Sequence, residues 1–378
     1  MPKMTGAQAL TKSLIDYGID TIFTLPGAQL DPMFDALYDE KERIKVIHTR
    51  HEQGTSYMAF GYAQSTGRVG VNLVVPGPGL LNASAGLSTA FACGAKVLCL
   101  AGQIPSKLIG GGIGQLHELA DQPGAVASVT KWRGRAEEPE DAPERVREAF
   151  IQLNTGRTQP VLLEMAPDIM ATKADVTLLD TQSDYAKIDP TPDPELIEKA
   201  AALLGSANNP AVIIGGGIWG AEESLLALAE ELQAPVYTSP HGHGAIDSRH
   251  YLAQNLMCAK EIWDSIDVVL SVGTRYQAPA TWGKAEEKKL IRIDIDPKQS
   301  LNICEPDVHI VSTASASLAA LFERVQLHNR KRESRSEEYE MLKTTVMDRF
   351  NSVEPQFSYN NVIREELPED GIAVFGVT

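Results

Sequence analysis

The chain has 378 residues, of which 43% are hydrophobic, so it is long enough for two or three domains with sizeable cores. Its formal net charge of −16 gives a surface that repels phosphate backbones and anionic membranes, which argues against nucleic acid and membranes as partners. Four cysteines without a CxxC spacing, and an N-terminus without the apolar core of a signal peptide, lead us to expect a cytoplasmic protein.

The first 170 or so residues alternate helical and strand patterns. Helices are expected over 5–18, 31–38, 52–65, 80–92 and 140–154, and apolar strands at TIFTLPG, IKVIHTR, VGVNLVVPGPG, KVLCLAGQ and PVLLEMA. Short strands rich in Val, Ile and Leu, separated by helices, predict a parallel sheet that helices cover on both faces. We assign residues 1–180 to this domain.

A linker rich in proline and aspartate, KIDPTPDPELIEK, precedes a second alternating series. Its strands are AVIIGGG, PVYTSP, VVLSVG, KLIRIDID and HIVST, and a helix over 315–327 closes it. This predicts a second, Rossmann-like domain over 190–328. The fold class is therefore α/β, with tandem doubly wound parallel-sheet domains.

The remaining sequence has a different pattern. The charged stretch HNRKRESRSEEYEMLKTTVMDRF predicts a helical, solvated connector, and we assign 329–355 to a linker. The segment FSYNNVIREELPEDGIAVFGVT predicts a helix, a turn and a buried strand over 356–378. A buried parallel strand needs neighbours at its edges, so we expect another chain or a longer polypeptide to complete this unit.

One glycine motif would suit a dinucleotide. Gly215, Gly217 and Gly220 satisfy G-x-G-x-x-G between a predicted strand and a predicted helix. The next strand ends in Thr238 and Ser239, without the acidic residue that would hold a ribose. A tight strand-to-helix turn explains the glycines equally well, so both interpretations stay open.

Glu52 stands at a strand-to-helix junction in HTRHEQGTSYMAFGYAQSTG, flanked by His48 and His51. A carboxylate in the first turn of a helix interacts well with the helix dipole, which explains Glu52 without a catalytic role. Histidines in such places more often pack or form hydrogen bonds than catalyse. A further histidine pair, HGHG at 241–244, has no third ligand at a recognisable spacing, so no metal ligands are predicted.

Glu52 belongs to the second of four segments that occur in a fixed order. They are TLPGAQLDPMFDAL, RHEQGTSYMAFGYAQSTG, NLVVPGPGLLNASAGLSTAF and VLCLAGQIPS. Together they resemble the pyrimidine-binding domain of the thiamine-diphosphate-dependent enzymes, the superfamily of acetolactate synthase, benzoylformate decarboxylase and 2-hydroxyacyl-CoA lyase. GIGQLHELADQPGAVASVTKW is similar to the loop and helix that border the active site in the synthases. VVLSVGTRYQAP and IRIDIDPKQ resemble the central domain, and FSYNNVIREELPEDGIAVFGVT resembles the opening of the diphosphate-binding domain.

The resemblance implies that Glu52 is a catalytic residue. It would hydrogen-bond the aminopyrimidine ring of thiamine diphosphate and so promote loss of the proton at thiazolium C2. This role needs a carboxyl group in an apolar pocket, where loss of hydration favours its protonated form, and Tyr57, Met58 and Phe60 follow in the sequence.

Further site residues follow from the same resemblance. Gly27 and Ala28 would lie near the reacting end of the cofactor, and Pro76, Gly77 and Asn82 along the pyrimidine. Leu116 and His117 stand where many synthases carry phenylalanine and glutamine. His117 would thereby alter substrate handling, or it is a histidine of a surface loop.

The central domain binds FAD or an ADP moiety in some members of the superfamily, and many have lost that binding. Gly215, Gly216, Gly217 and Arg275 are the candidate contacts here. The family holds Mg²⁺ with a GDG motif and a later asparagine pair, and no GDG occurs in this sequence. The Mg²⁺ ligands are therefore expected in a missing C-terminal region, and the chain alone is expected to offer half a site and to be inactive.

The resemblance thus implies a thiamine-diphosphate-dependent lyase or transferase that decarboxylates a small 2-oxo acid and protonates the product or ligates it to a second carbonyl, most like acetolactate synthase. Activity like that of benzoylformate decarboxylase or 2-hydroxyacyl-CoA lyase is the alternative within the superfamily. A non-catalytic or partner-dependent subunit and an NAD-dependent dehydrogenase are alternatives of other classes. Expected partners are a homodimer or homotetramer, or a second chain that carries the diphosphate-binding half.

Overall fold

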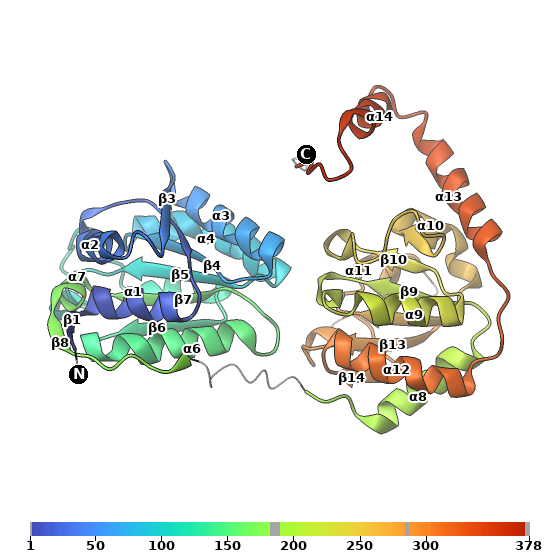
Figure 1. The fold of residues 1–378 in the computed structure, drawn as a ribbon, viewed down its shortest axis with the longest axis horizontal. Coiled ribbons are helices and arrows are strands. Elements are labelled where there is room, and N and C mark those ends of the chain that lie inside the picture. Colours follow the sequence, from blue (N-terminus) through green and yellow to red (C-terminus); the bar gives the residue numbers. More distant parts are fainter. Residues whose placement is uncertain (1, 182–189, 284–286, 302, 375–378) are drawn as a thin grey trace. The chain divides into compact units, whose positions relative to one another are not determined.

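The computed structural model describes residues 2–181, 190–283, 287–301 and 303–374, and it divides the chain into two units, Met1–Asp189 and Pro190–Thr378 (Figure 1). The start of the predicted linker lies outside the described residues. Its end already belongs to a helix, which Asp193 caps by accepting a hydrogen bond from the backbone N–H of Glu195. Among the described residues, no helix combines the length and apolarity needed to cross a bilayer.

The first unit is a parallel sheet between two layers of helices. Its six strands have the order β3-β2-β4-β5-β7-β6, and all neighbouring pairs are parallel. In chain order the elements are β1 (Lys3–Thr5), α1 (Gly6–Asp16), β2 (Thr21–Thr24), α2 (Asp31–Asp39), β3 (Lys45–His48), α3 (Glu52–Thr66), β4 (Gly70–Val74), α4 (Pro78–Cys93), β5 (Val97–Gly102), α5 (Gln122–Ala125), β6 (Trp132–Ala136), α6 (Ala142–Asn154), β7 (Val161–Met165), α7 (Pro167–Ala171) and β8 (Lys173–Asp175).

Burial explains this layering. The apolar faces of α1, α2 and α6 pack against one face of the sheet, and those of α3 and α4 against the other. Strands β4, β5 and β7 are buried along their whole length, as expected for central strands covered on both faces. The predicted doubly wound fold of this domain is therefore confirmed.

Two strand pairings of this unit were not predicted from the sequence. Strand β6, with the sequence WRGRA, lies at the edge of the sheet, and two arginines interrupt its apolar pattern. A separate antiparallel ribbon pairs β1 with β8, so that the beginning and the end of the unit lie side by side. Both features depend on contacts distant in sequence, which local patterns do not record.

The second unit repeats the architecture. Its six-stranded parallel sheet has the order β11-β10-β9-β12-β13-β14. In chain order the elements are α8 (Pro194–Ser206), β9 (Pro210–Ile214), α9 (Glu222–Leu232), β10 (Val236–Thr238), β11 (Ala253–Asn255), α10 (Leu256–Ile262), β12 (Val268–Val272), α11 (Gln277–Ala280), β13 (Lys289–Asp294), β14 (Val308–Val311), α12 (Ala314–His328), α13 (Ser336–Phe350) and α14 (Gln356–Glu366). Helices α8, α9 and α12 cover one face and α10 packs on the other, as the prediction of a second α/β domain requires.

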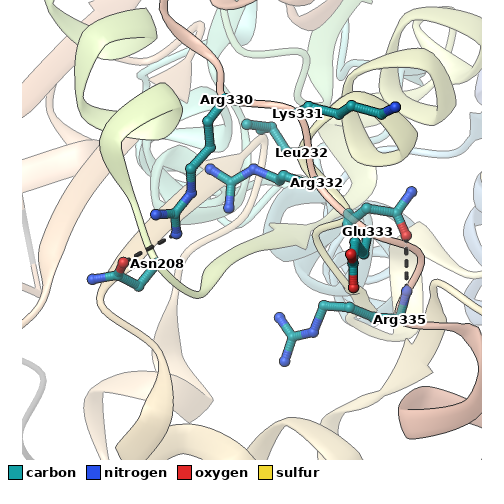
Figure 2. Close-up of a pocket in the computed structure, with 8 residues that line it drawn as sticks. Asn208, Leu232, Arg330, Lys331, Arg332, Glu333 and Arg335 are labelled. Carbon is teal, nitrogen blue, oxygen red and sulfur yellow. Dashed lines mark hydrogen bonds between the residues drawn. The ribbon is translucent and has the colours of Figure 1, made fainter.

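The charged stretch after α12 is helical over α13, as predicted, but it is not wholly solvated, and that part of the prediction is corrected. Tyr339 of α13 is fully buried in the core of the second unit, and Val346, seven residues later on the same helix face, is buried too. Upstream, Arg330 donates to the Asn208 side chain and Arg332 to carbonyl oxygens at the end of α8, around a shallow pocket of about 230 Å³ (Figure 2). The charged composition conceals two buried anchors that lie on one helix face, about two turns apart.

The last described segment confirms one prediction and corrects another. Helix α14 is present as expected, with Tyr359 and Val362 exposed. The buried strand predicted at GIAVFGV is absent over 371–374, where Ile372 and Val374 are 89% and 91% exposed. No described strand lies alongside this segment, and an isolated strand has nothing to pair with. Residues 375–378 lie outside the described residues, and the assignment of 356–378 to a third domain stays a prediction.

Candidate functional site

The predicted site residues of the first unit meet at one edge of its sheet. Strands β3, β2, β4 and β5 are neighbours and parallel, so their carboxyl ends and the segments that follow lie together. The Gly27 turn follows β2, Glu52 follows β3, and Pro76 and Gly77 follow β4. In open α/β sheets this edge is where ligands bind.

The side chain of Val75 brings three of these segments into contact. A Cβ added at Gly27 would overlap Val75 Cγ1, and one at Gly79 would lie 2.5 Å from Val75 Cγ2 and 3.5 Å from Glu52 Oε1. Larger residues at Gly27 or Gly79 would therefore push the turn, the start of α4 and Glu52 apart. The absence of a side chain at the two glycines makes room for the Val75 side chain at the base of the site.

Glu52 is the first residue of α3 and is anchored from both sides. His51 caps the helix, with its Nδ1 atom accepting from the backbone N–H of Gln53 at 3.1 Å. Thr55 donates its hydroxyl to the Glu52 carbonyl oxygen at 2.7 Å. Asn82 of α4 donates through Nδ2 to Glu52 Oε2 at 3.0 Å. The carboxylate is thus held by one oxygen, and the other lies beside Gly79.

The described residues of this unit do not by themselves enclose Glu52 in an apolar pocket, so that expectation stays a prediction. Glu52 is half-buried and Asn82 is exposed. Of the apolar residues that follow in α3, Tyr57 and Met58 are each 40% exposed, and Phe60 packs in the core beneath the helix. The α3–α4 surface therefore presents a carboxylate together with exposed apolar side chains.

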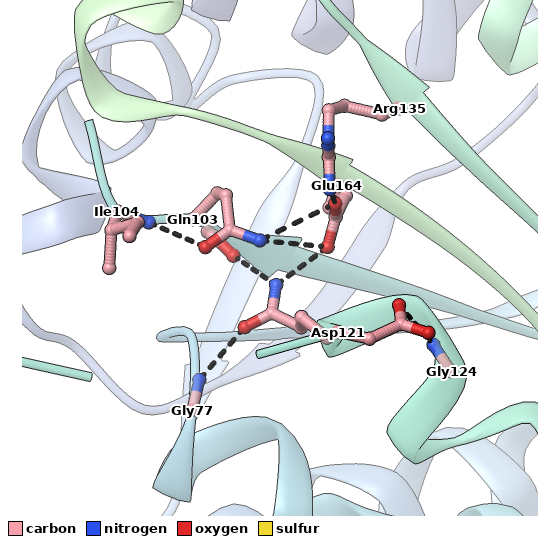
Figure 3. Close-up of polar contacts among 9 residues, drawn as sticks. Gly77, Gln103, Ile104, Asp121, Gly124, Arg135 and Glu164 are labelled. Atoms are coloured by element: carbon pink, nitrogen blue, oxygen red, sulfur yellow. Dashed lines mark hydrogen bonds and ion pairs between the residues drawn. The ribbon is translucent and has the colours of Figure 1, made fainter. Parts of the chain in front are cut away.

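A buried polar network supports the site from below (Figure 3). The backbone N–H of Gly77 donates to Gln122 Oε1 at 2.9 Å, and Gln122 Nε2 donates to Glu164 Oε2 at 2.7 Å. Glu164 lies in β7 and forms an ion pair with Arg135 of β6 at 2.5 Å. Gln103 donates to the same carboxylate at 3.4 Å. Sequence patterns did not predict these polar residues individually. Only Gln122 lies in a segment that the sequence resemblance assigns to the border of the active site.

His117 belongs to the site, whereas Leu116 does not fill it. His117 has φ +71°, and its carbonyl oxygen is 2.5 Å from where a Cβ of Gly77 would lie. Its Nδ1 atom is 2.7 Å from Gln29 Nε2, and because an amide nitrogen only donates, the imidazole proton resides on Nε2 in this arrangement. Leu116 is 71% exposed. Gln29, missed in the sequence, ties the His117 loop to the Gly27 turn.

The remaining predicted positions of this unit fall near the same edge. Ala28 begins a short 3₁₀ turn after Gly27 and is exposed, while Pro76 and Gly77 are buried. Gly77 has φ +59° and is the N-cap residue of α4, so this turn favours glycine. The structure therefore brings Gly27, Glu52, Gly77, Asn82 and His117 together.

The glycines of the second unit serve its own packing. The N–H groups of Gly215 and Gly217 donate to the carbonyl oxygens of Val272 and Gly273, and a Cβ at Gly217 would lie 2.7 Å from Gly273 Cα. The N–H of Gly220 donates to the Glu222 carboxylate in the first turn of α9.

These bonds favour the strand-to-helix turn over a dinucleotide fingerprint. The N–H groups of Gly215, Gly217 and Gly220 are thus already paired, and the acidic first turn of α9 repels an anion. Arg275 is exposed and follows the last residue of β12, Val272, in the next segment of the chain. The assignment of Gly215, Gly216, Gly217 and Arg275 to FAD or ADP stays a prediction.

The histidines of the HGHG loop have local roles. His243 Nδ1 lies 3.0 Å from the Thr238 hydroxyl, and the His241 carbonyl oxygen accepts from Trp219 Nε1 at 3.1 Å. Within the described residues, no group of three or more His, Cys, Asp or Glu side chains has an arrangement that could hold a metal ion.

Comparison with known proteins gives both units a family. Residues 4–125 match the thiamine pyrophosphate enzyme N-terminal TPP binding domain, and residues 197–321 match the central domain of the same enzymes. Thiamine pyrophosphate is another name for thiamine diphosphate. The chain therefore belongs to the superfamily of thiamine-diphosphate-dependent enzymes, as its motifs predicted.

Curated relatives match most of the chain. The probable acetolactate synthase large subunit of Methanocaldococcus jannaschii is 34% identical over 333 residues, which are 84% of this chain and 56% of the relative. The probable 2-ketoarginine decarboxylase AruI of Pseudomonas aeruginosa is 33% identical over 330 residues, 85% of this chain and 58% of the relative. The acetolactate synthase large subunit of Corynebacterium glutamicum is 32% identical over 354 residues, 90% and 56% respectively. The chain thus spans a little over half the length of these relatives.

Proposed function

We propose that this chain carries the N-terminal and central domains of an enzyme that decarboxylates a small 2-oxo acid and ligates the product to a second carbonyl compound, as acetolactate synthases do. The observation that carries the proposal is the Glu52 carboxylate, held through one oxygen by Asn82 beside the close-packed Gly27 and Gly79 turns. The names of two of the relatives support the same reaction.

The donor set fits the pyrimidine end of thiamine diphosphate. A carboxylate with one oxygen anchored and the other directed along a glycine-lined surface can hold a proton at the ring nitrogen N1′. Exposed Tyr57 and Met58 offer apolar surface on the same helix. When bound, the cofactor supplies the electron sink that decarboxylation of a 2-oxo acid requires.

Each candidate site residue of the first unit then has a role. Glu52 binds and exchanges the proton at N1′, and Asn82 fixes the orientation of its carboxylate. Pro76 and Gly77 would hold the pyrimidine of the cofactor, and Gly27 and Ala28 would lie toward its reacting end. His117 presents its Nε2–H to the substrate, where a neutral donor binds a carboxylate or carbonyl oxygen.

The proposal extends to groups that the described residues do not supply. Mg²⁺ would be bound by ligands other than those described, since these contain no metal-binding group of acids, histidines or cysteines. A diphosphate-binding half would come from further polypeptide or from a second chain, within a homodimer or homotetramer in a cytoplasmic setting. FAD or ADP in the central domain would have to compete with the hydrogen bonds that the N–H groups of Gly215 and Gly217 already form.

A decarboxylase without ligation is the second candidate. One relative is named as a probable 2-ketoarginine decarboxylase and is as similar to this chain as the synthases are. The two candidates share the role of Glu52 and differ in whether the product is protonated or added to a carbonyl. Product analysis with pyruvate separates them, since only the synthase reaction yields acetolactate.

The test is substitution of Glu52. The protein, purified with the polypeptides that accompany it, is assayed with thiamine diphosphate, Mg²⁺ and pyruvate or a longer 2-oxo acid. Glu52→Gln keeps the size of the side chain and removes the exchangeable carboxyl proton, so turnover should fall by about 10²–10⁴-fold. Glu42→Gln, at an exposed position outside the site, is the matched control and should keep full activity. Equal turnover in the Glu52→Gln and Glu42→Gln variants would overturn the proposal.

A further inference from the structure

Glu164 is a carboxylate that the proposed chemistry does not use. It lies in β7, is fully buried, and pairs with Arg135 directly across the parallel register of β6 and β7. A buried charge is costly unless it is paired and its lone pairs accept hydrogen bonds. Arg135, Gln122 and Gln103 together supply those donors. This network lies beneath the turn that carries Gly77, so it is in a position to hold that turn in place.

The network fixes the side-chain amide of Gln122 in one orientation. Its Nε2 atom donates to Glu164 Oε2 at 2.7 Å and to the Gly102 carbonyl oxygen at 3.0 Å. Both partners accept only, so the nitrogen must face them and the amide oxygen must face the opposite way. On that side the only described donor in contact is the backbone N–H of Gly77, at 2.9 Å.

Gly77 is the residue through which the Gln122 amide contacts the site. It is the N-cap residue of α4, has no side chain to cap the helix, and its carbonyl oxygen accepts from the N–H of Leu81. Asn82, the next residue, holds the Glu52 carboxylate. Hydrogen bonds therefore connect Arg135 and Glu164 through Gln122 to Gly77 (Figure 3). The first turn of α4 and the Asn82–Glu52 hydrogen bond continue this path to Glu52.

We infer that Gln122 is a positioning residue, oriented by the buried Arg135–Glu164 pair, that sets the backbone of Gly77 and thereby the Asn82–Glu52 hydrogen bond. Gln122 is also the first residue of α5, at the end of the loop that contains His117. The same amide therefore fastens that loop to the start of α4. Only the catalytic consequence of this inference rests on the proposed function.

The direct test is amide hydrogen exchange in the full chain, followed residue by residue by NMR. Gln122→Met keeps the length of the side chain but removes both the donor and the acceptor. We expect exchange at Gly77, Leu81 and Asn82 to become about tenfold faster, as for the loss of one buried hydrogen bond. The resonance of the Asn82 side-chain amide should move as well, because its contact with Glu52 is displaced.

A core truncation separates positioning from general destabilisation. Leu14→Ala creates a cavity in the same unit, at a fully buried position of α1 outside the network. It should speed exchange around α1 and leave the Asn82 side-chain resonance in place. Gln122→Met with wild-type exchange at Gly77, or with the same pattern as Leu14→Ala, would overturn the inference.

Two further measurements secure the test. If Gln122→Met fails to fold, Arg135→Lys replaces it. This variant keeps the charge beside Glu164 but loses the contact that Arg135 makes through two nitrogen atoms, so it should shift the same Gly77 and Asn82 signals by a smaller amount. Unchanged signals would count against the inference. In the assembled enzyme, Gln122→Met should weaken binding of thiamine diphosphate with Mg²⁺ about tenfold, and Leu14→Ala should not. Since the exchange experiment needs no cofactor, its result for Gln122 holds even if the proposed function fails.

Discussion

Each of the two units has its own six-stranded parallel sheet, but the segments that follow the strands differ between them. In the first, the segments after β3, β4 and β5 present Glu52, Asn82 and His117 near glycine turns, and one carboxylate oxygen of Glu52 accepts no hydrogen bond from a described residue. In the second, the glycines after β9 donate their N–H groups to carbonyl oxygens at the end of β12 and to the Glu222 carboxylate. That unit also draws Tyr339 of α13 into its core.

This difference shows that the architecture alone does not make a site. Both sheets offer the edge at which α/β proteins bind ligands. Whether a ligand can bind there depends on which polar groups remain after the loops have satisfied their own backbone. A buried network can fix the position of such polar groups. We infer this for the Arg135–Glu164 pair, which orients Gln122 and through it the Gly77 turn.

The largest effect on stability is expected at Tyr339, the anchor that distinguishes the second unit. Tyr339→Ala should lower the free energy of unfolding by about 3–5 kcal/mol, because it empties a fully buried position. Tyr339→Phe should be neutral or stabilising by up to about 1 kcal/mol, since the hydroxyl is buried and has no hydrogen-bond partner among the described residues. Chemical denaturation measures both. A mild Tyr339→Ala effect would mean that the stretch is a solvated connector after all.

The next effect concerns the Gly77 turn of the first unit. Gly77→Ala should cost about 2–4 kcal/mol, because the new Cβ combines a left-handed φ with a 2.5 Å approach to the His117 carbonyl oxygen. Gly67→Ala is the matched control, with a similar φ of +69° and open space around the Cβ, and should cost about 1 kcal/mol. Equal losses in the two variants would show that the loop does not press on the turn.

A smaller effect is expected where the second unit closes its strand ends. Gly217→Ala should destabilise that unit by about 1–3 kcal/mol through overlap with the Gly273 backbone. Gly216→Ala, whose Cβ would lie 3.3 Å from His241 Cβ and 3.8 Å from the His241 carbonyl oxygen, should cost less. The unfolding midpoints in denaturant give the comparison. If Gly217→Ala were tolerated and FAD or ADP bound the wild type, the glycines would be a ligand cradle instead.

The smallest effect is a pH dependence in the loop before His117. Hydrogen bonds from the backbone N–H of Gln115, and also from those of Gly112, Gly114 and Ile113, lower the pKa of the Glu118 carboxyl from its ordinary 4.5. The ordering it provides is therefore complete above that ordinary value and is lost as the pH falls through the lowered pKa. NMR relaxation of these amides should report a more mobile loop at a pH below the lowered pKa than at neutral pH. Glu118→Gln should be mobile at both, and a loop insensitive to pH in the wild type would refute this account.

The sequence predicted the parts of the site that local motifs carry. Gly27, Glu52 and Gly77 each follow a strand, and parallel strands place such residues at one edge, so their meeting was foreseeable. Glu164 and Arg135 were not, because their partners lie 29 to 61 residues away and buried polar pairs leave no local pattern. The charge of the α13 segment concealed Tyr339 and Val346 for a related reason, since burial there depends on one helix face and not on composition.

The most direct test of the role of Glu52 is deuterium exchange at C2 of thiamine diphosphate, measured by NMR in the presence of Mg²⁺ and the protein with the polypeptides that accompany it. This observable depends on cofactor activation alone and not on the identity of the 2-oxo acid. We predict exchange well above the rate in buffer for the wild type, and a return toward that rate in Glu52→Gln. Wild-type exchange no faster than in buffer, or equal acceleration by both proteins, would contradict the assignment of Glu52.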